Sequence, residues 1–147
     1  FYGVGGSGPV AQDAAHKFMK TGKPVIAYTD THMQSMAAAL VKPEDVVVAI
    51  SHSGSSRDII DALAVAKRRG ATTIGITHYA RSPIDKVLEI KLGTLSYETL
   101  YRMESTSSRI AQLAIIDALF IGVCLRDPAQ AVQNICLTRE VIAPKRF

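Results

Sequence analysis

The run DVVVAI at residues 45–50 is followed directly by SHSGSSR at residues 51–57. Val46 to Ile50 are apolar without interruption, which is typical of a strand whose two faces are both covered by other elements. Such strands occur in parallel sheets that have helices on both faces. The polar stretch that follows places several hydroxyl groups where this strand ends and a helix begins. This junction constrains the fold more than any other feature of the chain.

Short apolar runs alternate with helical patterns along all 147 residues. The pattern predicts strands over residues 1–4, 25–28, 46–50, 73–77 and 89–92. Helices are expected over residues 9–21, 32–41, 56–69, 83–87, 107–125 and 128–140. Five strands that alternate with helices predict an α/β domain with a parallel sheet. Right-handed crossovers leave two common strand orders, 2-1-3-4-5 and the Rossmann order.

The composition is that of a globular domain, with 48% hydrophobic residues, 20% charged residues and a net charge of +4. The length suits one domain with a substantial core. The basic residues are scattered, and the cluster at 67–69 closes a predicted helix, where cations complement the helix dipole. We therefore expect no direct contact between this sequence and nucleic acid.

Two features bear on the compartment. Cys124 and Cys136 lie in helical patterns outside any CxxC pair, which is typical of reduced thiols in a cytoplasmic protein. The most apolar run, residues 110–125, contains Gln112 and Asp117 and is shorter than the about 20 residues that a membrane-spanning helix needs. We predict a buried helix there and no membrane contact.

Two loops join the end of a predicted strand to the start of a helix: GVGGSG at 3–8 and SHSGSSR at 51–57. In the order 2-1-3-4-5 they follow neighbouring strands whose crossovers leave on opposite faces, and ligands bind in the crevice at such a point. Helix N-termini favour anions, glycines let backbone amides approach, and serine hydroxyls add neutral donors. The loops predict a phosphate monoester site without a basic residue in contact. The structural alternative is a turn closed by Ser51 and Ser53, with Ser56 as an N-cap.

A dinucleotide site is a competing interpretation of the first loop. Gly3, Gly5 and Gly8 match the pattern G-x-G-x-x-G between a strand and a helix, and Asp30 ends the second predicted strand, where a ribose-binding acid belongs. Against it, the third strand carries the richer set of donors, and the chain lacks an evident second nucleotide-binding half. The phosphate monoester is therefore favoured.

Hydrolase and metal chemistry are poorly supported. Ser51 and His52 are adjacent on an extended segment, so their side chains point to opposite faces, and no G-x-S-x-G motif occurs. Asp30 and His32 are two isolated ligand types, which a loop or a helix cap explains equally well. We predict no catalytic residue, no metal and no cofactor.

The two loops and a late helix resemble the SIS (sugar isomerase) domain. The similarity runs from GVGGSGPVAQDAAHKF through DVVVAISHSGSSRDIIDALAVAK to SSRIAQLAIIDALF. It implies a three-layer αβα sandwich with a five-stranded parallel sheet of order 2-1-3-4-5, the flavodoxin-like SIS fold. It also implies that the S-x-S-G-x-[ST] loop binds the phosphate of a phosphosugar through Ser51, Ser53 and Ser56, together with Ser7 of the first loop. The predicted binding set also includes Gly6, Gly54 and His52.

A closer resemblance is to the C-terminal effector domain of RpiR-type bacterial transcription regulators. ISHSG and SSRIAQLAIIDAL are typical of that branch. The resemblance implies an N-terminal helix-turn-helix domain outside this sequence, through which alone DNA would be contacted. It also implies sugar contacts from His32 and Arg109, with Glu104 near the sugar pocket. A structural hydrogen bond for Arg109 and a solvated position for Glu104 are the alternatives.

These observations define the expected organisation and function. We expect a phosphosugar-binding SIS domain over residues 1–126 and a C-terminal helix over 127–147, packed on the domain or on a partner subunit. The resemblance implies a homodimer or a dimer of dimers, with the apolar helix at 110–125 covered by the partner; an internal core helix is the alternative. The expected function is phosphosugar sensing for transcription regulation. An aldose–ketose phosphosugar isomerase is the alternative, and Glu104, His32 and His78 are its plausible bases.

Overall fold

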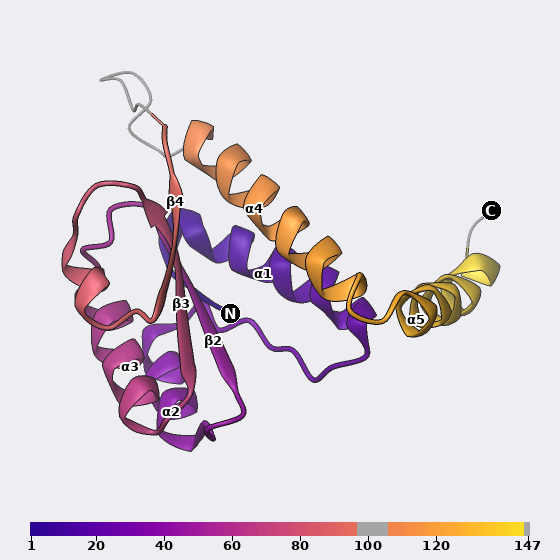
Figure 1. Cartoon of the computed structure of the whole chain (residues 1–147), viewed down its shortest axis with the longest axis horizontal. Coiled ribbons are helices and arrows are strands. Elements are labelled where there is room, and N and C mark those ends of the chain that lie inside the picture. The colour runs from indigo at the N-terminus through magenta and orange to yellow at the C-terminus, as the bar shows by residue number, and fades with distance from the viewer. Residues whose placement is uncertain (97–105, 146–147) are drawn as a thin grey trace.

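The computed structural model describes residues 1–96 and 106–145 of the chain (Figure 1). The strands are β1 (Tyr2–Gly3), β2 (Val46–Ser51), β3 (Thr72–His78) and β4 (Ile90–Thr94). The α-helices are α1 (Gly8–Phe18), α2 (Thr31–Leu40), α3 (Arg57–Arg68), α4 (Thr106–Cys124) and α5 (Pro128–Ile142). Short 3-10 turns are η1 (Gly5–Ser7), η2 (Met19–Thr21), η3 (Pro83–Lys86) and η4 (Ala143–Lys145).

Within the described residues the sheet has four parallel strands in the order β1-β2-β3-β4. The predicted five-stranded order 2-1-3-4-5 is therefore wrong, because residues 25–28 form no strand. Tyr28 does lie beside β1, on the side away from β2, but it makes a single bridge, to Tyr2. Because β1 is only 2 residues long, it offers residues 25–28 few backbone partners for a strand. Ile26 in this segment is 58% exposed.

Helices cover both faces of this sheet. α1 and α4 lie on one face and α2 and α3 on the other (Figure 1). Because side chains alternate along a strand, Val47 and Ala49 of β2 pack into the α2–α3 cluster, and Val48 and Ile50 pack into the α1–α4 cluster. The three-layer αβα sandwich is confirmed, and it explains why β2 reads as an uninterrupted apolar run.

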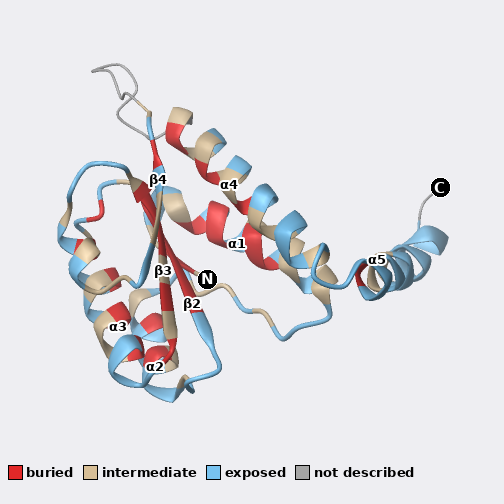
Figure 2. Cartoon of the chain, in the orientation of Figure 1, coloured by how far each residue is buried: buried red, intermediate tan, exposed pale blue. Residues whose placement is uncertain are grey.

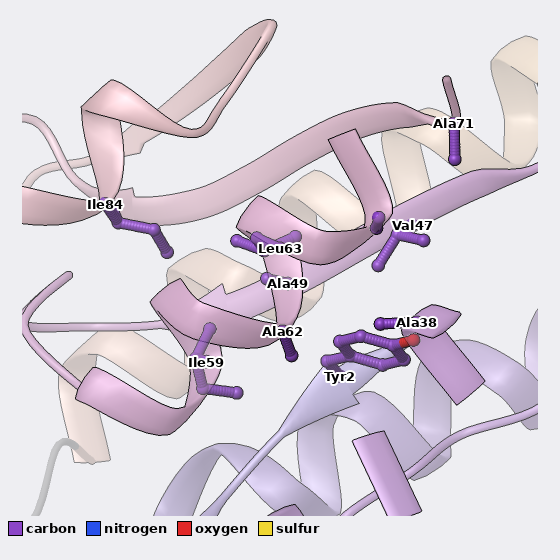
Figure 3. Close-up of a cluster of buried hydrophobic side chains, with 10 residues drawn as sticks. Tyr2, Ala38, Val47, Ala49, Ile59, Ala62, Leu63, Ala71 and Ile84 are labelled. Atoms are coloured by element: carbon purple, nitrogen blue, oxygen red, sulfur yellow. The ribbon is translucent and has the colours of Figure 1, made fainter. Parts of the chain in front are cut away.

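The α2–α3 face is closed within the chain. Figure 3 shows Ile59 and Leu63 of α3 directed at the sheet, and both are fully buried. Small residues on the same face let helix and sheet approach closely. The buried alanines of this cluster are Ala38, Ala49, Ala62, Ala66 and Ala71.

The α4 helix buries a single stripe. Ser108, Gln112 and Ile116 recur every 4 residues and are buried, whereas Ile110 is 73% and Ile121 53% exposed (Figure 2). By length and composition alone, Ser107–Cys124 would suffice to cross a membrane, a test that core helices of soluble proteins also pass. The prediction of a buried helix therefore holds for one side only. An ion pair between Lys17 and Asp117 joins α4 to α1.

The last helix, α5, lies at the end of α4, away from the sheet (Figure 1). It begins at Pro128, and the Asp127 side chain caps it by accepting a hydrogen bond from the Gln130 N–H at 3.1 Å. Asn134 packs against Gly22, just after η2, where an added Cβ would meet its Nδ2 at 2.7 Å. Helix α5 thus contacts the α1–η2 end of the domain, opposite the start of α1.

Candidate functional site

The two donor-rich loops leave neighbouring strand ends. Gly3 of β1 pairs with Ile50 of β2 in a parallel register, so the chain leaves both strands at the same edge of the sheet. From β1 it enters η1 and α1 on one face, and from β2 it enters α3 on the other. This is the arrangement that forms a ligand crevice at a switch point in α/β sheets. The sequence predicted that the strand at residues 1–4 and the strand at residues 46–50 are neighbours. Their pairing as β1 and β2 confirms this prediction.

The first loop is a tight turn whose backbone requires glycine. A Cβ on Gly3 would lie 2.5 Å from the carbonyl oxygen of Ser7, and Gly5 has a φ of 52°. The Ser7 N–H donates to the Val4 carbonyl at 3.0 Å, while the Ser7 side chain makes no capping hydrogen bond at the start of α1. Gly6 is exposed and Ser7 is half-buried, directly before the first residue of α1.

The serine loop is built around Gly54, which has a φ of 61°. Ser51 is buried at the end of β2, and its carbonyl accepts from the Gly54 N–H at 3.2 Å. The Ser53 hydroxyl accepts from the Ser55 N–H at 3.3 Å, which leaves its own proton free to donate. Ser56 stands at the N-cap position of α3, yet its side chain does not cap the helix. The purely structural interpretation of this loop, a turn followed by a Ser56 N-cap, therefore accounts for the turn but not for the Ser56 hydroxyl.

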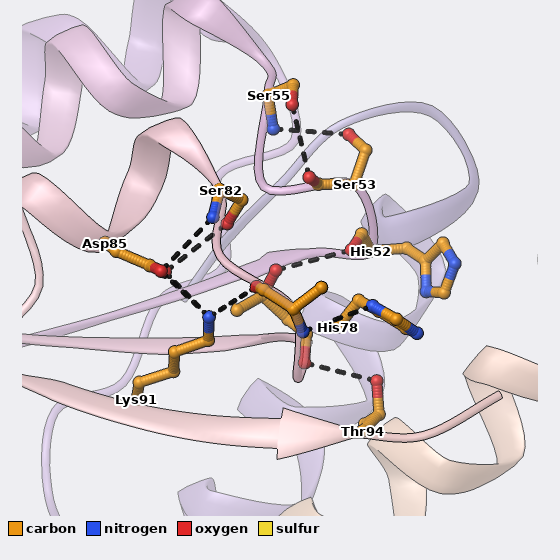
Figure 4. Close-up of polar contacts among 10 residues, drawn as sticks. His52, Ser53, Ser55, His78, Ser82, Asp85, Lys91 and Thr94 are labelled. Atoms are coloured by element: carbon orange, nitrogen blue, oxygen red, sulfur yellow. Dashed lines mark hydrogen bonds and ion pairs between the residues drawn. The ribbon is translucent and has the colours of Figure 1, made fainter.

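A polar network supports the serine loop from the side of η3 (Figure 4). The Ile84 N–H donates to the Gly54 carbonyl at 3.0 Å, and a Cβ on Gly54 would collide with the Ser82 hydroxyl. Ser82 and Asp85 form a reciprocal capping box. Lys91 reaches Asp85 at 2.9 Å, and its hydrogen bond holds the pKa of that carboxyl below its ordinary value. The network fixes η3 in the position that the serine loop packs against.

Two histidines meet at the ends of β2 and β3. The His52 carbonyl accepts hydrogen bonds from the His78 N–H at 3.0 Å and from the Thr77 hydroxyl at 3.3 Å. The two imidazole centroids are 5.6 Å apart, in an edge-to-face arrangement. His78 was predicted only as a plausible base, and its place beside the serine loop was not predicted. Its place follows from the register of the folded sheet, in which β3, ending at His78, pairs residue by residue with β2, which ends just before His52.

The remaining predicted residues lie around this edge. His32 is exposed in the first turn of α2, which the Asp30 side chain caps by accepting the Met33 N–H at 2.8 Å. Thr29, just before α2, packs against Gly8 at the start of α1, so this turn adjoins the first loop. Arg109 lies in the first turns of α4, and its buried Nε has no hydrogen-bond partner among the residues that the structure describes.

Glu104 lies outside the described residues. Within the described part of the chain, no group of three or more histidine, cysteine, aspartate or glutamate side chains is placed to hold a metal ion. Because Asp30 serves as a helix cap, its side chain already has a structural role.

An apolar groove of about 580 Å³ lies between β4 and α4, away from the two loops. Leu92 and Gly93 line it from the sheet, and Ile115, Leu119 and Gly122 line it from the helix. It contains none of the predicted binding residues. Its lining suits another apolar surface rather than an anionic ligand.

Comparison with known proteins places this geometry in a family. The SIS domain model matches residues 1–122, and the chain belongs to that family. An HTH-type transcriptional regulator of Caldanaerobacter subterraneus subsp. tengcongensis, itself uncharacterised, is 42% identical over 147 residues, which covers 100% of this chain and 52% of that protein. The HTH-type transcriptional regulator RpiR of Escherichia coli K12 is 37% identical over 141 residues, covering 96% of this chain and 48% of that protein. The chain thus spans about half the length of these relatives.

Among solved structures, the NanR protein of Vibrio vulnificus complexed with ManNAc-6P superimposes with a TM-score of 0.91 at 26% identity. The match covers 99% of this chain and 55% of NanR. The described elements, including α5, therefore follow an arrangement found in a protein solved in complex with ManNAc-6P.

Proposed function

We propose that this chain is the phosphosugar-sensing effector domain of a bacterial transcription regulator. The observation that carries the proposal is the meeting of two donor-rich loops at neighbouring strand ends, with the hydroxyls of Ser7 and Ser56 not used as helix caps. The two relatives described above, which match 100% and 96% of this chain, are named HTH-type transcriptional regulators, which supports sensing over catalysis. Membership of the SIS family favours a phosphosugar over a dinucleotide.

The phosphate is held by neutral donors and helix ends. Ser51, Ser53, Ser56 and Ser7 supply hydroxyl protons, and the backbone amides near Gly6 and Gly54 approach the anion closely. The N-termini of α1 and α3 point their unpaired N–H groups and positive dipole ends at the same space. Such a cradle requires no basic side chain, and it discriminates against a sugar that lacks the phosphate.

The sugar is contacted from the rim of the cradle. His52 belongs to the serine loop, and His32 and Arg109 begin helices at this edge. A buried donor without a partner is costly, so the Arg109 Nε favours a ligand that brings an acceptor oxygen. Glu104 is proposed to accept sugar hydroxyls. N-acetylhexosamine, hexose and pentose phosphates all satisfy this donor set.

The signal is transmitted through a dimer. The exposed apolar side of α4 and the groove beside β4 fit a second copy of this chain, giving a homodimer or a dimer of dimers. A phosphosugar shifts the dimer between two arrangements by its differential affinity for them. An N-terminal helix-turn-helix domain in the longer protein would transmit the change to DNA in the cytoplasm. No cofactor takes part.

Isomerase activity is the competing function. Aldose–ketose isomerisation needs a base that moves a proton between adjacent carbons. His78 is the described candidate nearest to the serine loop, and His32 and Glu104 are the others. We expect binding without turnover when the 147-residue chain is incubated with hexose, pentose and amino-sugar phosphates. Measurable interconversion would replace the sensing function with the enzymatic one.

The first prediction tests the cradle by calorimetry. Ser53→Ala should weaken phosphosugar binding by about 1–2 kcal/mol, the cost of one hydrogen bond to a charged group. Ser55→Ala is the matched control, because Ser55 lies in the same loop but its hydroxyl donates to the Ser53 carbonyl at 3.2 Å. The panel is ManNAc-6P, glucose 6-phosphate and ribose 5-phosphate, each with its unphosphorylated sugar, and NAD. An unchanged Kd in Ser53→Ala, or tighter binding of NAD than of every phosphosugar, would overturn the proposal.

A further inference from the structure

The end of β3 presents a side chain that the phosphate cradle does not use. His78 is the last residue of β3, and its backbone is hydrogen-bonded to His52 in the serine loop. In the order β1-β2-β3, the cradle lies at the ends of β1 and β2, so His78 stands one strand, about 4.8 Å, to its side. A group in this position borders the cradle without belonging to it.

The hydrogen bonding of His78 fixes its tautomer. The Ala80 N–H donates to Nδ1 of His78 at 3.3 Å. Because Nδ1 is the acceptor, the proton of the neutral ring lies on Nε2, at the far end of the imidazole. Among the described residues, no hydrogen bond or ion pair engages Nε2, and the side chain is only half-buried. His78 therefore offers a fixed and unused donor.

The direction of the ring separates it from the supporting network. Figure 4 shows the His52 and His78 rings on one side of the β3 end, pointing away from Ser82, Asp85 and Lys91. The Tyr79 ring packs against His78 with centroids 4.7 Å apart, which limits the rotamers that the imidazole can adopt. The ring is thus held where it can meet a ligand. On the other side of the strand end, Ser82, Asp85 and Lys91 form the network that supports the serine loop.

We infer that His78 is a specificity-determining residue that donates a hydrogen bond from Nε2 to an oxygen of the sugar portion of the bound phosphosugar, and not to its phosphate. The inference rests on the proposed function, because it needs a phosphosugar in the cradle. Its role is to select among sugars that carry the same phosphate.

Two substitutions separate ligand contact from loop support. His78→Gln keeps a donor at the distal end of the side chain but loses the Nδ1 acceptor. His78→Asn keeps an acceptor near the position of Nδ1 but loses the distal donor. His16→Gln is the control, since His16 is exposed in the last turn of α1. Calorimetry on the 147-residue chain measures Kd for ManNAc-6P, glucose 6-phosphate, ribose 5-phosphate and inorganic phosphate.

We expect His78→Asn to weaken the tightest of the three phosphosugars by about 5–10-fold, the loss of one neutral hydrogen bond, with inorganic phosphate unchanged within about twofold. His78→Gln should bind that phosphosugar within about twofold of the wild type. A larger loss of affinity in His78→Gln than in His78→Asn would overturn the inference. So would equal losses in the two variants, or an equal loss of affinity for inorganic phosphate.

The two proposals fail differently. If Ser53→Ala weakens binding while both His78 variants match the wild type, the cradle stands and the role of His78 is refuted. If the wild type binds none of the three phosphosugars, the proposed function is refuted, and the role of His78 is refuted with it.

Discussion

The two faces of the sheet are covered in different ways. On the α2–α3 face, Ile59 and Leu63 are fully buried, and helices of the same chain close the layer. On the other face, α4 buries the stripe through Ile116 but leaves Ile121 53% and Ile110 73% exposed. Figure 2 shows this contrast as a buried interior beside α3 and an outer side of α4 that is largely open.

The difference separates two tasks within one small domain. The α2–α3 face holds β2 and the segment around Ile84, and Ile84 anchors the serine loop through Gly54. The serine loop, the proposed binding loop, is therefore supported by the part of the molecule that is complete in one chain. The α4 side is the part that the proposed second copy would cover, so we expect binding and assembly to respond to different substitutions.

The largest expected effect is on the closed face. Leu63→Ala removes a fully buried side chain and leaves a cavity, so the free energy of unfolding should fall by about 2–5 kcal/mol. Urea denaturation followed by circular dichroism measures it. Leu40→Ala is the matched control, because Leu40 is 78% exposed on α2 and should change stability by no more than about 0.5 kcal/mol. Equal losses in the two variants would contradict the description of a closed core.

A smaller effect is expected on the open face. Ile121→Asp places a charge on the exposed side of α4, which should weaken self-association by about tenfold or more if that side is the dimer interface. Sedimentation velocity across a concentration series measures the dimer dissociation constant. Ile26→Asp is the control, since Ile26 is 58% exposed beside β1 and away from α4. An unchanged dissociation constant in Ile121→Asp would move the interface elsewhere.

Several parts of this architecture were predictable because they depend on local patterns. The uninterrupted run Val46–Ile50 indicated a strand covered on both faces. The adjacency of the two loops was predicted from the order 2-1-3-4-5, one of the two orders that crossover rules left open, and the pairing of β1 with β2 bears out that adjacency. The strand expected at 25–28 failed because apolar composition does not report how much partner strand is available. The groove beside α4 and the position of His78 depend on tertiary packing and register, which single-sequence periodicity does not carry.

The smallest expected effect concerns the polar support at the edge of the closed face. The hydrogen bond from Lys91 lowers the pKa of Asp85, so the pair stabilises the fold above the ordinary carboxyl pKa, and this contribution is lost as pH falls through the lowered value. Asp85→Asn should therefore lower the free energy of unfolding at pH 7, read from thermal denaturation, by less than about 1 kcal/mol, because the pair is still partly open to solvent, and the gap to the wild type should narrow below about pH 4. Asp61→Asn breaks the looser Arg57–Asp61 pair, at 3.7 Å, and serves as the control. A gap that stays constant from pH 7 to pH 3 would show that Asp85 acts through the capping box with Ser82, rather than through its charge.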